Sequence, residues 1–175
     1  MPPKPKKCKA CKALFLPIKP LQAVCDFGCA IELNLINRAK VDRKELRVAR
    51  VVAKTRRDWM REAQTTFNAW IRKRDALLPC VSCQRHHEGQ WHAGHYMPTS
   101  TRSILRFNEL NVHKQCQPCN VHKHGNLINY RIELIKRIGI ELVEWLESGA
   151  HESKQWKIEE LKEIKAHQSK LLKEK

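Results

Sequence analysis

Eight cysteines fall into four close pairs, and this spacing constrains the fold of the chain more than any other feature. Thiolates two or three residues apart can share one metal ion, and two such pairs complete a tetrahedral zinc site. A disulfide framework suits secreted proteins, but no signal-peptide pattern follows the N-terminus. Unpaired structural thiols or a redox pair would not explain the regular pairing. We therefore predict two structural zinc ions, one bound by Cys8, Cys11, Cys25 and Cys29, the other by Cys80, Cys83, Cys116 and Cys119.

The chain is strongly basic, with 34 Lys and Arg against 18 Asp and Glu and a formal net charge of +16. Such an excess predicts a polyanionic partner, with nucleic acid favoured over an acidic membrane surface. No apolar run approaches the ~18 residues that a membrane span needs. We therefore expect a soluble, intracellular protein that binds nucleic acid and no membrane.

The basic residues concentrate in the N-terminal half. Residues 1–30 are rich in proline and predict a small zinc knuckle that its metal folds. Residues 31–79 predict one long helix or two, because no glycine or proline occurs between Cys29 and Leu78, and Pro79 ends the run. We predict that this helical segment binds DNA through Arg38, Arg43, Lys44, Arg47, Arg50, Lys54, Arg56 and Arg57.

The C-terminal half divides into a core and a helical cover, which makes the predicted fold class α+β, mostly α. Residues 80–126 predict turns and short strands, followed by a helix that begins near Cys119. Residues 127–175 predict helices, with a break at Gly139 and a last helix over 152–174. Aromatic and aliphatic side chains at helical spacing are interpreted as core: Trp59, Ala63, Phe67, Trp70, Ile71, Leu77 and Trp145.

The 80–126 segment contains, in order, Cys80-x-x-Cys83, His95, Asn111 and Cys116-x-x-Cys119-Asn120. This order resembles the His-Asn-His (HNH, or ββα-metal) nuclease motif. The resemblance implies a hairpin and a helix that enclose one catalytic divalent cation, with a four-cysteine zinc site fastening the two. The chemistry needs a neutral imidazole that accepts a proton near pH 7, and a hard cation with open coordination positions.

The resemblance assigns a role to each matching residue. His95 is the expected general base, and Asn111 is the middle asparagine that braces the loop and the base. Asn120 is the expected cation ligand at the start of the helix. Its place directly after the last cysteine is similar to that in phage junction-resolving endonucleases of the endonuclease VII type.

One position departs from the motif. The family commonly has an acidic cation ligand just before the catalytic histidine, and this chain has Gly94 there. His92, or less favourably His124, could replace that ligand, and imidazole suits a transition metal better than magnesium. The identity of the catalytic cation, magnesium or manganese in our expectation, is therefore left open. His113, His122 and His124 are expected to be accessory, in contact with phosphate or completing a metal shell. His86 and His87 could compete as zinc ligands, but the four cysteines make this unnecessary.

Beyond the motif, nearly the whole chain resembles the NinG (Rap) family of lambdoid phages, most closely in Arg57–Trp59, Gln64–Arg72, Ala93–Tyr96 and Gln115–Asn120. This resemblance implies a structure-specific endonuclease that acts in DNA recombination on D-loops and Holliday junctions, in the cytoplasm of the bacterial host. The preference for branched DNA rests on the resemblance alone.

The sequence thus favours a metal-dependent endodeoxyribonuclease in which His95, Asn111, Asn120 and His92 form the catalytic site. A non-catalytic zinc-finger protein that binds DNA or assists recombination is the main alternative, and an RNA-binding zinc protein is a third. Coordinated cutting of two strands usually needs a dimer, so we expect a homodimer. The apolar helices of residues 127–171 could form its interface or simply cover the core. Cleavage preference and protein partners are not readable from the sequence.

Overall fold

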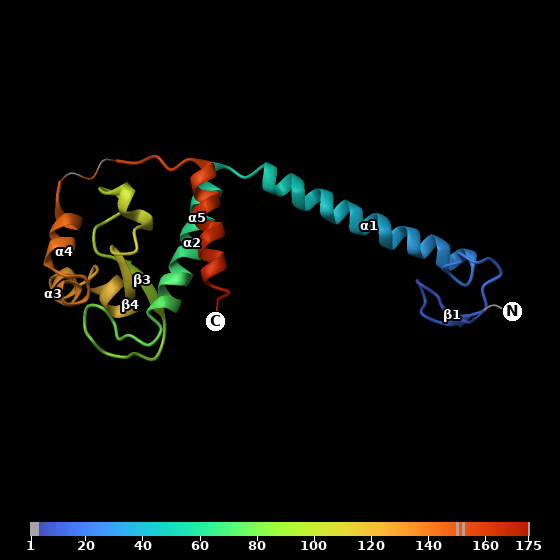
Figure 1. Ribbon diagram of the computed structural model, residues 1–175, viewed down its shortest axis with the longest axis horizontal. Coiled ribbons are helices and arrows are strands. Elements are labelled where there is room, and N and C mark those ends of the chain that lie inside the picture. Colours follow the sequence, from blue (N-terminus) through green and yellow to red (C-terminus); the bar gives the residue numbers. More distant parts are fainter. Residues whose placement is uncertain (1–3, 150, 152, 175) are drawn as a thin grey trace. The chain divides into compact units, whose positions relative to one another are not determined.

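The computed structural model describes residues 4–149, 151 and 153–174 (Figure 1). The fold is α+β, and the chain divides into two compact units with the boundary between Lys54 and Thr55. This boundary lies inside the 31–79 segment, so the predicted basic segment is shared between the two units. None of the helices in the described part of the chain is long and apolar enough to cross a membrane.

The first unit consists of a small knuckle and one long helix. Two short antiparallel strands, β1 (Lys6–Lys7) and β2 (Leu14–Phe15), form the knuckle. Helix α1 (Phe27–Val52) begins after Asp26, whose carboxylate accepts the Cys29 backbone N–H at 2.7 Å. An acidic cap of this kind satisfies an otherwise unpaired N–H at the first turn. No residue of α1, all of which is described, is buried.

The second unit begins with helix α2 (Arg56–Arg74), capped by a reciprocal pair of hydrogen bonds between Thr55 and Asp58. The predicted helical stretch is thus confirmed as two helices. The apolar face of α2 packs at one end against helix α5 (Ile158–Leu171) and at the other against Val112. Most of the predicted core residues of this helix are buried, but Leu77 is 93% exposed, because the chain leaves the helix before it.

The centre of the second unit is a β-hairpin. Strands β3 (Trp91–His95) and β4 (Val112–Cys116) pair antiparallel, with His92 opposite Gln115. A 3₁₀ turn, η1 (Ser103–Phe107), lies in the connection. The helix predicted near Cys119 is only a single π-helical turn, η2 (Pro118–His122). It stops there because the backbone turns left-handed at His124, Gly125 and Asn126.

Two short helices cover the hairpin region. Helices α3 (Leu127–Ile138) and α4 (Ile140–Glu147) are separated at Gly139, whose φ of 87° confirms the predicted break. Their apolar faces enclose a core together with residues of η1 and of the loops beside the hairpin. The helices contribute Tyr130, Leu134, Val143 and Leu146, and the turn and loops contribute Val81, Tyr96 and Leu105. Trp145 is not part of this core, since it is 44% exposed and contacts the His151 ring edge-on at 4.6 Å.

The predicted start of the last helix at residue 152 is wrong, and residue 152 itself lies outside the described residues. Helix α5 begins at Ile158, because the preceding segment bonds to η1 instead of continuing a helix. The Lys154 N–H donates to Ser103 Oγ at 2.6 Å, and Trp156 Nε1 donates to the Ser103 carbonyl at 3.0 Å.

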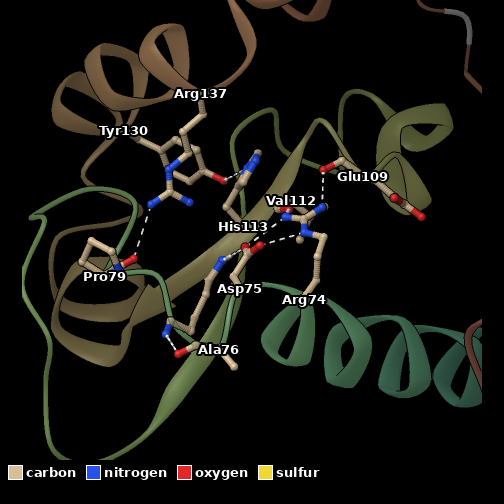
Figure 2. A network of polar contacts seen from close by, with 10 residues as sticks. Arg74, Asp75, Ala76, Pro79, Glu109, Val112, His113, Tyr130 and Arg137 are labelled. Carbon is tan, nitrogen blue, oxygen red and sulfur yellow. Dashed lines mark hydrogen bonds and ion pairs between the residues drawn. The ribbon is translucent and has the colours of Figure 1, made fainter. Parts of the chain in front are cut away.

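A buried polar network ties the end of α2 to the start of β4 (Figure 2). Asp75 accepts two hydrogen bonds from Arg74, at 2.7 and 2.9 Å, and one from the Lys114 N–H at 2.9 Å. Arg74 also donates to the carbonyls of Glu109 and Val112. Burial raises the pKa of Asp75, but these donors outweigh it and hold the pKa below its usual value. The network therefore fixes the register of β4 against α2.

Candidate metal centres and catalytic cleft

Both predicted groups of four cysteines come together in the structure. In each group the four Sγ atoms lie within 4.8 Å of one another, and all eight cysteines are free thiols. Four thiols at this separation match the ligand set of a structural zinc site. Each group could therefore hold one zinc ion, as predicted.

The first group folds the knuckle of the first unit. Cys8 is buried, whereas Cys11 is exposed, and Cys25 and Cys29 are half-buried beside the start of α1. Cys8 and Pro17 are the buried apolar residues among the described residues of this unit. A unit with so little core would depend on a bound metal ion for its stability.

The second group joins the hairpin to the turn that follows it. Cys116 ends β4, Cys119 lies in η2, and Cys80 and Cys83 lie in the loop after α2. Burial raises the pKa of Cys80, but backbone N–H donors, that of Cys116 foremost, outweigh it and lower the pKa below its usual value. Such donors stabilise the thiolate that binds metal.

His87 contacts the second group without replacing any of its ligands. Its Nε2 lies 3.1 Å from Cys83 Sγ, and its ring meets Trp91 edge-on at 5.9 Å. Because four thiols already form the group, His87 is placed as a hydrogen-bond partner of one of them. Such partners orient metal ligands and tune their basicity.

A cleft of about 420 Å³ opens beside the hairpin, and three of the predicted functional residues line it: His95, Asn120 and His124. His95 ends β3, and Asn120 lies in η2, directly after the last cysteine of the second group. The second cysteine group and the hairpin thus bring the candidate base and the candidate cation ligand to one cavity. His124, by contrast, is an exposed residue at its edge.

His95 is held in one orientation by a backbone carbonyl. Its Nε2 lies 3.0 Å from the Arg106 carbonyl oxygen. Because a carbonyl only accepts, Nε2 carries the proton of the neutral ring, and Nδ1 keeps its lone pair. Burial, with a smaller contribution from the Arg106 charge, lowers the pKa of His95, although the carbonyl opposes this shift. The ring is therefore neutral at pH 7 and can accept a proton at Nδ1.

Asn111 braces the loop that carries this carbonyl. The side chain is fully buried, and its Oδ1 accepts the Met97 N–H at 2.7 Å. Its Nδ2 donates to the carbonyls of Met97 at 3.0 Å and Leu105 at 3.2 Å. Asn111 thus joins the two ends of the loop that lies between His95 and Arg106. It lies behind the cleft and does not line it.

His92 and Asn120 contact each other directly. Asn120 Nδ2 lies 2.9 Å from His92 Nδ1, and the other ring nitrogen of His92 is buried without a hydrogen-bond partner among the described residues. His92 and His95 are three positions apart in β3, so their side chains project from opposite faces of the strand. Of the four predicted catalytic residues, His95 and Asn120 therefore share the cleft, while Asn111 and His92 support them.

Two groups at this site escape sequence reasoning. The first is the Arg106 carbonyl, a backbone atom for which no residue type is required. The second is Gln115, whose fully buried side chain lies against Gly94. Its position directly before Cys116 was the only available signal. The accessory interpretation of His113 as a phosphate or metal contact is wrong, because His113 is buried and contacts the Tyr130 hydroxyl at 3.2 Å (Figure 2).

The predicted DNA-binding side chains are divided between the units. Arg38, Arg43, Lys44, Arg47 and Arg50 are exposed along α1, and Lys54 is half-buried just after its end. Arg56 and Arg57 are exposed at the start of α2. Exposed guanidinium and ammonium groups along one helix can neutralise successive phosphates.

Comparison with known proteins places the whole chain in one family. A family model described as bacteriophage lambda NinG protein matches residues 1–175. The chain is 40% identical to protein NinG of Escherichia phage lambda over 192 residues, covering 98% of this chain and 94% of that protein. NinG of Escherichia phage 933W is 40% identical over 190 residues with the same coverage, and NinG of Salmonella phage P22 is 39% identical over 189 residues. No solved structure matches the chain.

Proposed function

The chain belongs to the NinG family of bacteriophage proteins, and we propose that it is a structure-specific DNA endonuclease with an HNH-like core. Its substrates are branched recombination intermediates, D-loops and Holliday junctions, which it cleaves by hydrolysis of a phosphodiester bond in the cytoplasm of the bacterial host. The observation that carries the proposal is the cleft that His95 shares with Asn120, with the Arg106 carbonyl leaving His95 Nδ1 free to accept a proton.

The roles of the residues follow from this arrangement. His95 Nδ1 takes a proton from a water molecule in the cleft, and the oxygen attacks the scissile phosphorus in line. The Arg106 carbonyl stabilises the ring as it becomes positively charged. Asn111 keeps that carbonyl in place through the loop that it braces. Cleavage releases the 3′ oxygen and leaves a 5′ phosphate.

Asn120 would hold a catalytic divalent cation, magnesium or manganese, next to the cleft, and His92 would either be a second ligand or orient the Asn120 amide. The donor set fits a cation in this region, because it includes an amide oxygen and a buried ring nitrogen without a described partner. When bound, the cation would stabilise charge on the phosphate and on the leaving oxygen.

Cleavage of a labelled four-way junction tests the assignment under single-turnover conditions. We expect His95→Ala to cut about 10² to 10⁴ times more slowly, since a general base is lost. Zinc content and junction binding should not change, because His95 belongs to neither cysteine group. His124→Ala is the matched control, since it removes an exposed imidazole from the same cleft. Near-normal cleavage by His95→Ala would overturn the catalytic role.

The same assay separates the enzyme from the alternative, a zinc protein that only binds DNA. That alternative is equally compatible with the cysteine groups and with the basic α1. It requires that the wild-type protein bind junctions without cutting them at any magnesium or manganese concentration. Charge reversal at Arg43, Arg47 and Arg50 should weaken junction binding and reduce its salt dependence under either function.

A further inference from the structure

Gly94 occupies the position where the motif commonly has an acidic cation ligand, and the structure shows what lies in the space of its missing side chain. A Cβ at Gly94 would lie 2.1 Å from Gln115 Oε1 and 3.2 Å from Asn120 Oδ1. The backbone of Gly94 is not in the left-handed region, so its conformation does not demand glycine. Glycine is needed here because the Gln115 side chain fills the space.

Hydrogen bonds fix which end of the Gln115 amide faces Gly94. Nε2 donates to the Gly125 carbonyl and to Ser82 Oγ, each at 2.6 Å. Since the Gly125 carbonyl can only accept, the NH₂ group must point toward it and Oε1 must point toward Gly94. Oε1 is buried and has no donor among the described residues. A buried oxygen without a donor is destabilising unless another group satisfies it.

Asn120 presents a second oxygen to the same point. Its Nδ2 lies 2.9 Å from His92 Nδ1, which can accept the amide hydrogen. With the NH₂ group turned to His92, Oδ1 is left facing Gly94. Two amide oxygens therefore border one point, and neither has a described donor that would neutralise its partial negative charge.

We propose that Gln115 Oε1 and Asn120 Oδ1 are ligands of one hard divalent cation, Mg²⁺ or Mn²⁺, and that Gln115 supplies the oxygen that Gly94 lacks. His92 is then a positioning residue, which orients the Asn120 amide through Nδ1. Oxygen ligands are those that magnesium and manganese prefer, and a site with few protein ligands leaves positions for water and substrate phosphate. The role of this cation in cleavage rests on the proposed function, whereas its binding does not.

Mn²⁺ binding to the full-length, zinc-loaded chain, measured by the EPR signal of the free ion, tests the proposal without DNA. We expect Gln115→Ala to weaken Mn²⁺ binding by about tenfold or more, a range typical of changes around a metal site. Ser82→Ala is the matched control, because it removes one partner of the Gln115 amide and leaves Oε1 in place. It should bind Mn²⁺ like the wild type.

A rescue distinguishes a ligand from a structural support. In Gly94→Asp/Gln115→Ala the second change empties the space into which the new carboxylate projects, and Mn²⁺ binding should recover. Gln115→Glu keeps an oxygen and adds charge while losing the two donated hydrogen bonds, so it should bind Mn²⁺ more tightly although the fold is less stable. If Gln115→Ala loses zinc or unfolds, the comparison of Gln115→Glu with the wild type decides.

Two results would overturn the proposal: wild-type Mn²⁺ affinity in Gln115→Ala, or no gain in affinity in Gln115→Glu. Junction cleavage by the same samples keeps the two proposals apart. Metal-dependent cutting that does not change when Gln115 is replaced would refute Gln115 as a cation ligand and would leave the proposed nuclease function standing. Mn²⁺ binding that depends on Gln115, in a protein that cuts no DNA, would refute the proposed nuclease function and would leave the proposed cation site standing.

Discussion

The loop that orients His95 should depend on Asn111 for its stability. Replacing Asn111 by alanine removes three hydrogen bonds from a fully buried side chain: one from the Met97 N–H and two to the carbonyls of Met97 and Leu105. The two bonds to the carbonyls contribute about 1 kcal/mol each, and the Met97 N–H left without its acceptor costs about 1–3 kcal/mol. We therefore expect Asn111→Ala to lower the free energy of unfolding by about 3–5 kcal/mol.

Urea unfolding of the zinc-saturated protein measures this loss. Asn108→Ala is the matched control, because it removes a half-buried side chain of the same loop that accepts one hydrogen bond, from the Leu110 N–H at 2.9 Å. It should cost about 1 kcal/mol. A loss for Asn111→Ala no greater than that of Asn108→Ala would refute the idea that Asn111 holds the loop.

The remaining predictions concern metal content and pH. Metal analysis should find two zinc ions per chain. Cys80→Ser should lose one and unfold the hairpin region, whereas Cys8→Ser should lose the other while the second unit stays folded. One zinc or none in well-folded wild-type protein would contradict the two sites. Burial lowers the pKa of His113 to about 3, below its usual value of ~6.5. Between these two pH values the unfolded chain binds more protons than the folded protein, so the free energy of unfolding should fall as the pH drops below 6.5. The loss in the free energy of unfolding at pH 5 is about 2 kcal/mol. The difference between the free energies of unfolding at pH 7 and pH 5 should therefore be smaller in His113→Gln than in the wild type.

Most helices were predictable because their signals are local. The absence of glycine and proline between Cys29 and Leu78 marks the α1–α2 stretch, and Gly139 marks the break between α3 and α4. The errors lie where tertiary contacts override local preference. The chain before Ile158 has helical composition, yet its backbone bonds to η1.

The sequence predicts the cysteines and His95 of the candidate site, but not the groups that hold them in place. The cysteine pairs and His95 carry their chemistry in their residue types, so spacing alone singles them out. The Arg106 carbonyl could come from any residue, and only the folded loop shows that it meets His95. Gln115 is an ordinary residue of a buried strand until its pairing opposite His92 places it beside Gly94.

The Tyr130 hydroxyl shows how α3 contributes to the same arrangement. It donates to the Gly94 carbonyl at 3.0 Å and lies 3.2 Å from His113 Nδ1, so one buried side chain bonds to both strands of the hairpin. Because the hydroxyl donates to the carbonyl, it must accept from His113, which requires a proton on His113 Nδ1. The hairpin is thus fixed at the cysteine group, at Asn111 and at Tyr130, three points that share no side chain.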